Sequence, residues 1–501
     1  MSITIKDLAS GWLIVLISVA NLAAEGSDLR LVEAAGRGDQ EAVRSLLQEQ
    51  VEVNLAYGDG MTALHWAAHW NDLEIAELLV GAGANVNAAN DYGVTPLSEA
   101  CTNQSDTLVT KLLQAGADAN ATQWTGETVL MTCALTGTVK AVKSLLNHGA
   151  DPNKRDSRFE QTALMWALAG RHSMVARTLV ENDANIRARS KSGFTPLMFA
   201  AQQGDMDSLR LLLGKGADLN AATPKHGNVL TVASSSGHEE LSIFLLEKGA
   251  DPNSPGENGV TALHYAMAAG LSMMNGLNYD KAYRLVPPNM PELVKALLAK
   301  GADVNAQIIV ALRLGPDDAA TGFGLARATP FFLAALSGDA ELLRVLAANG
   351  ADPSLRAKGE LTALMAAAGA GRGMTQGTIK YRLGDPAEAV KVVLDARADI
   401  HASNELGQTA LHGAAGAGED EVVQILVEGG AEVDAKDNDK QTPWSMAQGI
   451  SPRLGARGSY GSHPSTAALL LKLGATVRTR EDMIADGYSV PQVPVPEKPN
   501  P

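Results

Sequence analysis

Cysteine, aromatic residues and positive charge are all scarce in this chain of 501 residues. Two cysteines exclude a disulfide framework and a cysteine-rich metal protein. Aromatic residues make up only 4% of the chain, so we expect cores packed mainly by aliphatic side chains. Lysine and arginine number 41 against 56 aspartate and glutamate residues. The resulting net charge of −15 argues against a nucleic-acid scaffold, which needs a basic surface.

The overall composition is that of a folded protein with many turns. Apolar residues make up 46% and charged residues 19%, a balance that excludes disorder for most of the length. At about 150 residues per domain, the length predicts roughly three domains. Glycine occurs 49 times, which predicts many short and similar turns.

A short apolar run, residues 12–20, lies near the N-terminus behind Lys6. Together with the small residues that follow, this order is typical of a secretory signal cleaved near Ala23 or Ala24. The run is too short to span a bilayer, which needs about 20 apolar residues. We expect residues 1–24 to be a signal peptide on a periplasmic or secreted protein, which does not span the membrane after cleavage. The alternative is an apolar capping helix on a cytoplasmic protein.

One motif recurs along the chain roughly every 33 residues, a period that indicates stacked structural repeats. It reads Thr-Ala-Leu-His at Thr62 and Thr-Pro-Leu-Ser at Thr95, and a Gly-Ala-Asn motif at Gly83 runs in phase with it. Between the two motifs, apolar residues follow helical spacing, and no unit can bury that stripe without a neighbour. The further copies begin at Thr128, Thr162, Thr195, Asn228, Thr261, Thr329, Thr362, Thr409 and Thr442.

These motifs resemble those of the ankyrin family. Thr-Ala-Leu-His-Trp-Ala-Ala at Thr62 and Gly-Ala-Asp-Val-Asn-Ala at Gly301 look like its consensus, and the resemblance covers about residues 28–478. It implies an all-α fold, a solenoid of about twelve helix-turn-helix repeats with short β-hairpin loops. With its leader and long inserts, the arrangement is similar to exported bacterial ankyrin-repeat proteins. The resemblance implies a non-enzymatic module that binds a protein or peptide through its concave face and hairpin tips.

Departures from the period divide the chain into a regular half and a decorated half. Repeats 1–7 span residues 28–260, whereas repeats 8–12 span residues 261–478 and carry inserts. Three of the inserts fall between the two helices of repeats 8, 10 and 12. Residues 479–501 form a proline-rich tail, which we expect to be extended.

Aromatic residues gather four residues after the threonine and at the hairpin tips, and Trp70 lies another four residues on from Trp66, on the same face of its helix. Exposed tryptophan and tyrosine are favoured at binding hot spots. The alternative is that these side chains only pack between repeats. The residues that we expect to anchor a partner are Trp66, Trp70, Tyr92, Trp124, Trp166 and Phe199.

The inserts supply an alternative site. They are rich in basic residues and tyrosine, and because they leave equivalent turns they are expected to emerge on one edge. A lobe formed by them would suit a small-ligand-binding or catalytic protein. Its residues would be Tyr283, Arg284, Tyr381, Arg382 and Arg457.

No motif in the chain predicts catalysis, a cofactor or a metal. A nucleophile–base set and a Walker loop are both lacking. His65 and His69 have the four-residue spacing of a metal-binding pair, but no glutamate lies between them. We therefore expect both histidines to be structural.

The two cysteines are predicted to be small core residues without a bond between them. Cys133 occupies a position that holds alanine in the other repeats, and Cys101 lies one position later, where alanine also recurs. A disulfide needs Cα atoms within about 7 Å, whereas helices pack 8–10 Å apart.

Overall fold

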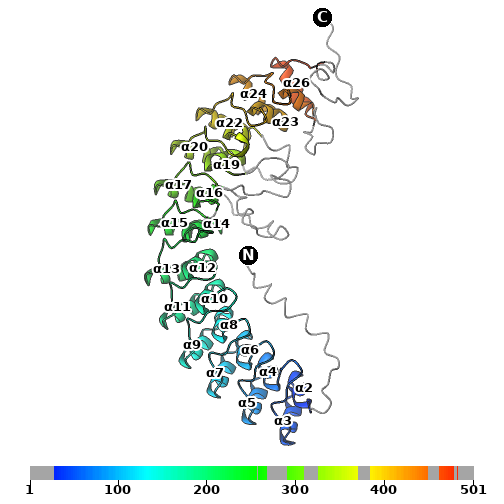
Figure 1. Cartoon of the computed structure of the whole chain (residues 1–501), viewed down its shortest axis with the longest axis vertical. Coiled ribbons are helices and arrows are strands. Elements are labelled where there is room, and N and C mark those ends of the chain that lie inside the picture. The colour runs from blue at the N-terminus through cyan, green and yellow to red at the C-terminus, as the bar shows by residue number, and fades with distance from the viewer. Residues whose placement is uncertain are drawn as a thin grey trace. The chain divides into compact units, whose positions relative to one another are not determined.

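The computed structural model describes residues 28–256, 258–267, 290–309, 325–369, 384–449, 462–478 and 482. Within these ranges the chain is helical, and its helices form twelve consecutive pairs, one pair for each repeat (Figure 1). The predicted all-α solenoid is therefore confirmed. The predicted hairpins contain isolated bridges in place of strands, as between Ala56 and Thr62 and between Thr122 and Thr128.

Contacts divide the chain into two compact units, Met1–Thr223 and Pro224–Pro501. The predicted boundary at residue 260 marks a different property, the start of the inserts, and stays a prediction. The inner helices of the first unit are α2 (Arg30–Gly36), α4 (Ala63–His69), α6 (Pro96–Thr102), α8 (Val129–Thr136), α10 (Ala163–Ala169) and α12 (Pro196–Gln203). Its outer helices are α3 (Gln40–Gln48), α5 (Leu73–Gly81), α7 (Asp106–Gln114), α9 (Val139–Asn147), α11 (Ser173–Glu181) and α13 (Met206–Gly214).

The second unit repeats the same pairing. Its inner helices are α14 (Val229–Ser235), α16 (Ala262–Met267), α19 (Pro330–Ser337), α21 (Ala363–Ala367), α23 (Ala410–Ala417) and α25 (Pro443–Ala447). Its outer helices are α15 (Glu239–Glu247), α17 (Pro291–Ala299), α20 (Ala340–Ala348), α22 (Pro386–Asp395), α24 (Asp420–Glu428) and α26 (Pro464–Lys472). A 3-10 turn, η3 (Lys358–Glu360), lies between α20 and α21.

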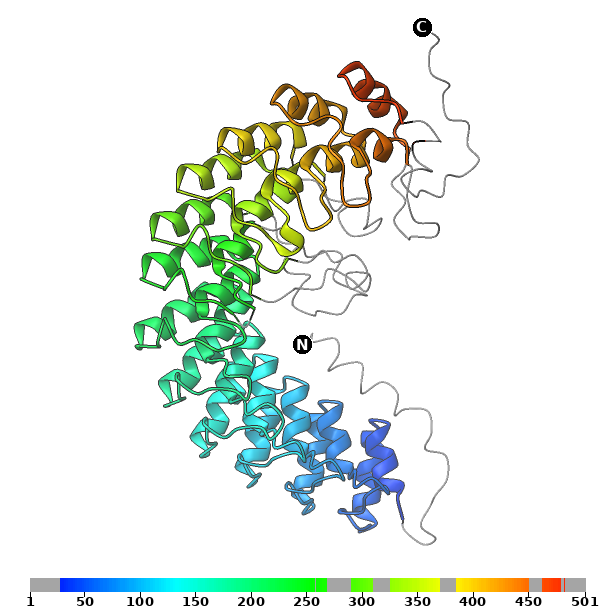
Figure 2. The ribbon, with the colours of Figure 1, turned by 45° about the horizontal axis from the view of Figure 1, so that its top comes forward.

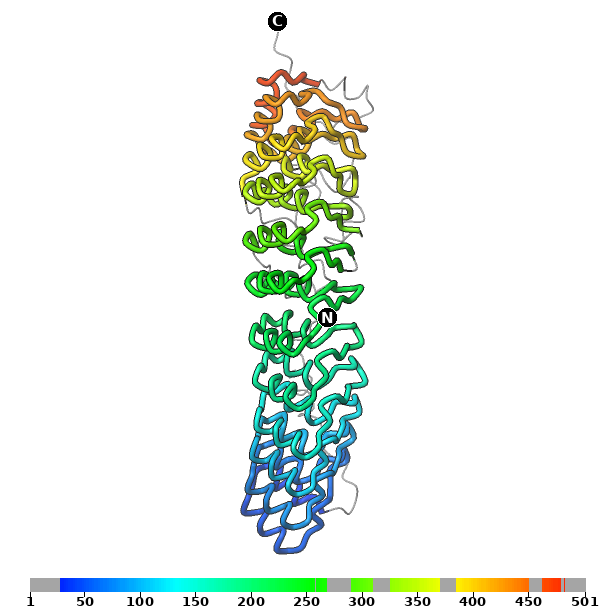
Figure 3. Tube along the Cα trace, turned by 90° about the vertical axis from the view of Figure 1, so that its left-hand side faces the viewer, coloured from blue at the N-terminus to red at the C-terminus, as the bar shows by residue number. Residues whose placement is uncertain are grey.

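Stacking of repeats buries the apolar stripes that no repeat buries alone. In the second repeat, Leu64 of α4 and Ile75 and Leu79 of α5 are at most 1% exposed. Helix α4 packs between α2 and α6 and also against α5, its own outer helix. Figure 2 shows the resulting two rows of helices in the first unit, and Figure 3 shows that the loops between repeats line one side of each unit. Each repeat therefore adds one inner helix and one loop to the surface of its unit.

The threonine of most motifs begins the inner helix, and in three of the described repeats a histidine ties that helix to the next repeat. The side chain of Thr62 accepts a hydrogen bond from the backbone N–H of His65, and the His65 Nδ1 accepts one from the backbone N–H of Thr62. The His65 Nε2 donates to the carbonyl oxygen of Val94 at 3.0 Å. Because both ring nitrogens are occupied, His65 has a structural role, as predicted, and is not a metal ligand.

The glycine of the second motif permits the turn that links most of the outer helices to the next hairpin. Gly116 follows α7 with a φ of 91°, a conformation that favours glycine. Its carbonyl oxygen accepts a hydrogen bond from the side-chain amide of Asn87 at 3.0 Å, and the Asn87 Oδ1 accepts one from the backbone N–H of Asp118 at 2.7 Å. Asn120 makes the same pair of bonds to Gly149 and Asp151. These bonds fix the spacing between consecutive repeats.

Candidate functional site

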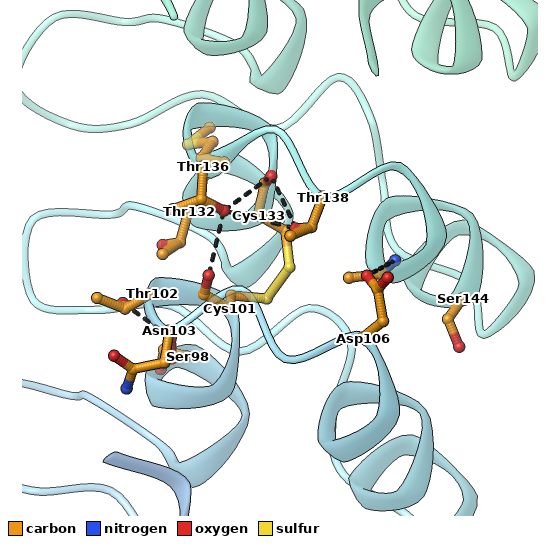
Figure 4. Close-up of a disulfide and its surroundings, with 12 residues drawn as sticks. Ser98, Cys101, Thr102, Asn103, Asp106, Thr132, Cys133, Thr136, Thr138 and Ser144 are labelled. Carbon is orange, nitrogen blue, oxygen red and sulfur yellow. Dashed lines mark hydrogen bonds between the residues drawn. A yellow bond between two sulfur atoms is a disulfide. The ribbon is translucent and has the colours of Figure 1, made fainter. Parts of the chain in front are cut away.

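A disulfide joins Cys101 of α6 to Cys133 of α8, so the prediction that these residues are unpaired was wrong (Figure 4). The prediction that both are buried is confirmed, because each is 0% exposed. The error came from comparing helix axes with Cα atoms. A Cα lies about 2.3 Å from its helix axis, so facing Cα atoms approach to about 3.4–5.4 Å when the axes are about 8–10 Å apart. The observed Cα–Cα distance is 4.7 Å.

Polar bonds reinforce the junction that the disulfide makes between repeats 3 and 4. The hydroxyl of Thr136 lies 3.1 Å from the carbonyl oxygen of Cys101 and 3.2 Å from that of Cys133. The backbone N–H of Ala141 donates to the carboxylate of Asp106 at 3.1 Å, which links the outer helices of the same two repeats. The disulfide and these hydrogen bonds therefore hold repeats 3 and 4 together within the first unit.

The six predicted anchor residues differ widely in exposure. Trp70, Tyr92 and Trp124 are 56%, 55% and 75% exposed. Trp66 and Trp166 are half-buried, and the indole nitrogen of each is enclosed without a hydrogen-bond partner. Phe199 is only 8% exposed, and its ring lies edge-on to Phe194 at 5.6 Å. Packing against Phe194 accounts for the burial of Phe199, whereas Trp70, Tyr92 and Trp124 remain available to a partner.

Tyr92 and Trp124 occupy the tips of neighbouring hairpins. The backbone N–H of Trp124 donates to the carbonyl oxygen of Tyr92 at 3.0 Å, so the two tips are held side by side. The same backbone bond recurs between other tips, from Ser157 to Thr125 and from Lys191 to Phe159. The exposed rings are thus carried by a rigid edge of the first unit.

A second aromatic group lies on the inner helices of the first two repeats. Trp66 packs on Gly36 of α2, and the Trp70 Nε1 donates to the carbonyl oxygen of Gly36 at 2.9 Å. The His69 ring lies between the two indoles, edge-on to each, with ring centroids 5.7 Å from Trp66 and 4.9 Å from Trp70. Tyr57 extends the group, edge-on to Trp66. These contacts fix the orientation of Trp70 while leaving much of it exposed.

A buried carboxylate lies beside these rings. Glu99 of α6 is 6% exposed, and its Oε2 lies 3.2 Å from the Nδ1 of His69. This hydrogen bond raises the pKa of His69, and partial burial opposes the rise. Glu99 occupies the repeat position that holds Trp66 and Trp166 elsewhere. The sequence analysis assigned Glu99 no role, although the other repeats from the second onward have an uncharged residue at this position.

The residues of the alternative insert site lie outside the described ranges. Tyr283, Arg284, Tyr381, Arg382 and Arg457 all belong to this group, so the predicted lobe stays a prediction.

Two surface hollows lie over the fifth and sixth repeats, and both are small. They hold about 260 and 200 Å³ and include Phe159 and Lys191 in one and Arg187 and Asp218 in the other. Ligand pockets usually hold about 300–1,000 Å³. In the part of the chain that the structure describes, no group of three or more histidine, cysteine, aspartate or glutamate side chains is arranged to hold a metal ion. Over the same residues, no helix has the length and apolar character needed to cross a membrane.

Comparison with known families gives a direct match. The family described as ankyrin repeats (3 copies) matches residues 31–123, 100–190, 130–223, 197–308 and 378–480. A search of the curated proteins finds no match to the chain.

Proposed function

Because this chain belongs to the ankyrin-repeat family, we propose that it is an exported, non-enzymatic protein that binds another protein or peptide through its inner helices and hairpin tips. Ankyrin repeats are in general protein-interaction modules, and their extended surfaces suit a protein partner. The observation that carries the proposal is the exposure of three aromatic side chains on one part of the first unit. Trp70, Tyr92 and Trp124 are each more than half exposed, in repeats 2–4, in a chain with only 4% aromatic residues.

Rigid aromatic residues suit this role for a physical reason. A large ring buries much apolar area on binding while losing little side-chain entropy. Trp70 is held by its bond to Gly36, and Tyr92 and Trp124 are held by the bond between their hairpins. The surface is therefore ordered before the partner arrives, which reduces the entropy lost on binding.

Two features support export. The apolar run at residues 12–20 has the form of a secretory signal. The disulfide between Cys101 and Cys133 is a bond that persists in oxidising compartments and is rare in the cytosol. Fractionation of the native host with N-terminal sequencing tests this part. We expect a periplasmic or secreted protein that begins near residue 25, and an uncleaved cytoplasmic protein would overturn it.

The binding surface is tested by comparing variants in capture of a partner. Residues 25–501 are used as bait on periplasmic and membrane fractions, as wild type and as the Trp70→Ala/Tyr92→Ala/Trp124→Ala variant. Met174→Ala is the matched control, because Met174 is 59% exposed but lies on outer helix α11. The captured protein is then purified, and its affinity for each variant is measured by calorimetry.

We expect the triple variant to lose binding while the control keeps it. Truncating a hot-spot side chain costs about 2 kcal/mol or more, which is roughly a thirtyfold loss in affinity. Circular dichroism establishes that the triple variant is folded. Equal affinity of the triple variant and wild type would reject this surface as the binding site.

A further inference from the structure

Charged side chains are almost excluded from the inner helices. From α4 to α25, the described inner helices contain a single aspartate, glutamate, lysine or arginine residue, which is Glu99. The outer helices of the same repeats carry many charges, as in Asp106–Gln114 and Glu239–Glu247. Burying a carboxylate is costly unless specific bonds compensate for lost hydration. Glu99 is therefore an exception that packing does not explain.

The carboxylate of Glu99 has room for one more bond. Its Oε2 contacts His69, and among the described residues its Oε1 has no hydrogen-bond partner. The Oε1 atom is also absent from the fully enclosed unpartnered atoms, so it retains contact with the surface. An ionised carboxylate accepts bonds at both oxygens. His69, which holds this carboxylate, lies 4.9 Å from the exposed Trp70 ring between ring centroids, so the unused acceptor is suited to a donor that a partner supplies near these rings.

The surroundings of that acceptor favour a cation with a flat shape. The rings of Trp66 and Trp70 each contact the His69 ring edge-on, and Trp70 is 56% exposed. Indole faces attract cations, and a guanidinium group stacks on them while donating N–H bonds to a carboxylate. Arg37, which directly follows α2, is paired with Glu33 at 3.8 Å. The Oε1 of Glu99 therefore has no bond to a lysine or arginine of the first two repeats and can accept one from a guanidinium group of the partner.

We infer that Trp66, His69, Trp70 and Glu99 form a recognition site for an arginine side chain of the partner protein. This inference rests on the proposed function, since it names the chemistry of the partner at one place on that surface. The guanidinium stacks on Trp70 and donates to the Oε1 of Glu99. His69 holds the carboxylate in place from the other side through Oε2.

The site has a built-in dependence on pH. Protonated His69 neutralises Glu99 and repels a second cation, so the guanidinium binds best when His69 is neutral. Arginine binding therefore strengthens as pH rises through the pKa of His69. The other charged groups near the site are Glu33 of α2 and the adjoining Arg37, which pair with each other, and Asp59 of the hairpin of repeat 2. Glu99 is therefore the charge that faces His69.

The test uses a pair of short peptides that differ only in charge. Acetyl-Gly-Arg-Gly-amide and the same peptide with neutral citrulline are titrated into the full chain labelled with 5-fluorotryptophan. The fluorine signals of Trp66 and Trp70 are assigned with Trp→Phe variants. We expect both signals to shift with the arginine peptide, with affinity at least about tenfold higher than for citrulline, because charge-assisted bonds are the stronger ones. Equal affinity for the two peptides would overturn the inference without need of any variant.

Variants then assign the charge to one carboxylate. Glu99→Gln removes the charge with little change in shape and is expected to abolish the preference for arginine. Glu127→Gln is the matched control, because Glu127 is a half-buried carboxylate in the hairpin of repeat 4. The control is expected to bind as wild type does, and His69→Gln is expected to remove the pH dependence. Retained preference in Glu99→Gln, or its loss in Glu127→Gln, would contradict the assignment.

The failure of this inference can be told apart from failure of the proposed function. If the captured partner does not bind the Trp70→Ala/Tyr92→Ala/Trp124→Ala variant but binds Glu99→Gln normally, the proposed surface is supported and the arginine site is rejected. If the partner requires Glu99 and is lost when its arginine residues are replaced by citrulline, the arginine site stands. If the triple variant, which lacks Trp70, binds the partner normally, both the proposed surface and the arginine site fall.

Discussion

Cys101 and Cys133 connect the inner helices of two consecutive repeats through a bond that solvent does not reach. Their Cα atoms lie 4.7 Å apart, and both residues are 0% exposed. Each lies where most repeats place alanine, so the two sulfur atoms occupy space between small side chains of α6 and α8. The two cysteines are separated by 32 positions in the sequence, which is close to the length of one repeat. The bond therefore restrains the unfolded chain over the length of a single structural unit.

Removing the disulfide should lower the stability of the first unit substantially. Loop entropy for 32 residues gives a loss of about 4 kcal/mol in the Cys101→Ala/Cys133→Ala variant. Alanine is the appropriate replacement, because other repeats hold it at equivalent positions. Urea unfolding followed by circular dichroism measures the effect. The control is wild type that has been reduced in urea and refolded in reducing agent, and it should unfold at a urea concentration similar to that of the variant.

The disulfide should also resist reduction while the unit is folded. A thiolate has to reach one of the sulfur atoms to reduce the bond, and both lie fully buried. Alkylation with mass spectrometry is expected to find thiols at Cys101 and Cys133 only when urea and reducing agent are both present. Rapid alkylation of the native protein after addition of reducing agent alone would show that the junction between repeats 3 and 4 opens readily.

Trp124 and Phe199 should behave oppositely when each is truncated. Phe199 is 8% exposed and packs on Phe194, so Phe199→Ala should cost about 3–5 kcal/mol of stability. Trp124 is 75% exposed, so Trp124→Ala should change stability by no more than about 0.5 kcal/mol. Denaturant unfolding of both variants measures this. A large loss of stability in Trp124→Ala would show that its ring supports the hairpin, which would weaken its assignment as an anchor.

The repeat period was sufficient to predict the helices, because each feature of the motif has a local cause. A Pro at the first helical position, as at Pro96, needs no backbone N–H, and the glycine after the outer helix, as at Gly83, adopts a φ of 90°. These requirements depend on a few neighbouring residues, so they can be seen in sequence. The stacking of repeats followed from the same period.

Contacts between repeats were harder to predict, since they depend on distances across neighbouring helices. Trp66, Phe199 and Glu99 occupy the same position in their repeats, yet the structure half-buries the first and buries the other two. The neighbours decide the difference: Gly36 of the preceding repeat leaves space for Trp66, whereas Phe194, in the hairpin of the same repeat, covers Phe199. The disulfide was missed for a similar reason, because it depends on which Cα atoms face each other.

Two buried histidines should make the second unit sensitive to acid. Burial lowers the pKa of His264 and of His412 from 6.5 to about 4. The unfolded chain therefore binds more protons than the folded one between these values. Stability is fully present above pH 6.5 and is lost as pH falls toward 4, by about 3 kcal/mol for each histidine.

The variant His412→Ser tests this dependence with a replacement that the chain itself uses. Ser98 and Ser445 hold the same repeat position and cap Thr95 and Thr442 as His412 caps Thr409. Serine does not titrate, so the pH dependence of unfolding between pH 7 and 4 should be shallower than in wild type. The variant should be less stable at pH 7, because the bond from His412 to the carbonyl oxygen of Gln441 is lost. Parallel curves for the two proteins would mean that His412 is not the sensitive group.

His69 should show the opposite dependence in the first unit. Its hydrogen bond to Glu99 raises its pKa, whereas burial lowers it. The stability that this pair contributes is fully present below pH 6.5 and is lost as pH rises through the raised pKa of His69. In Glu99→Gln the raising cause disappears and burial remains, so the pKa of His69 should fall below 6.5. Titration of the His69 ring by NMR in both proteins measures the shift. An unchanged pKa would mean that Glu99 does not interact with His69 in solution, and the pH dependence expected of arginine binding would then lose its cause.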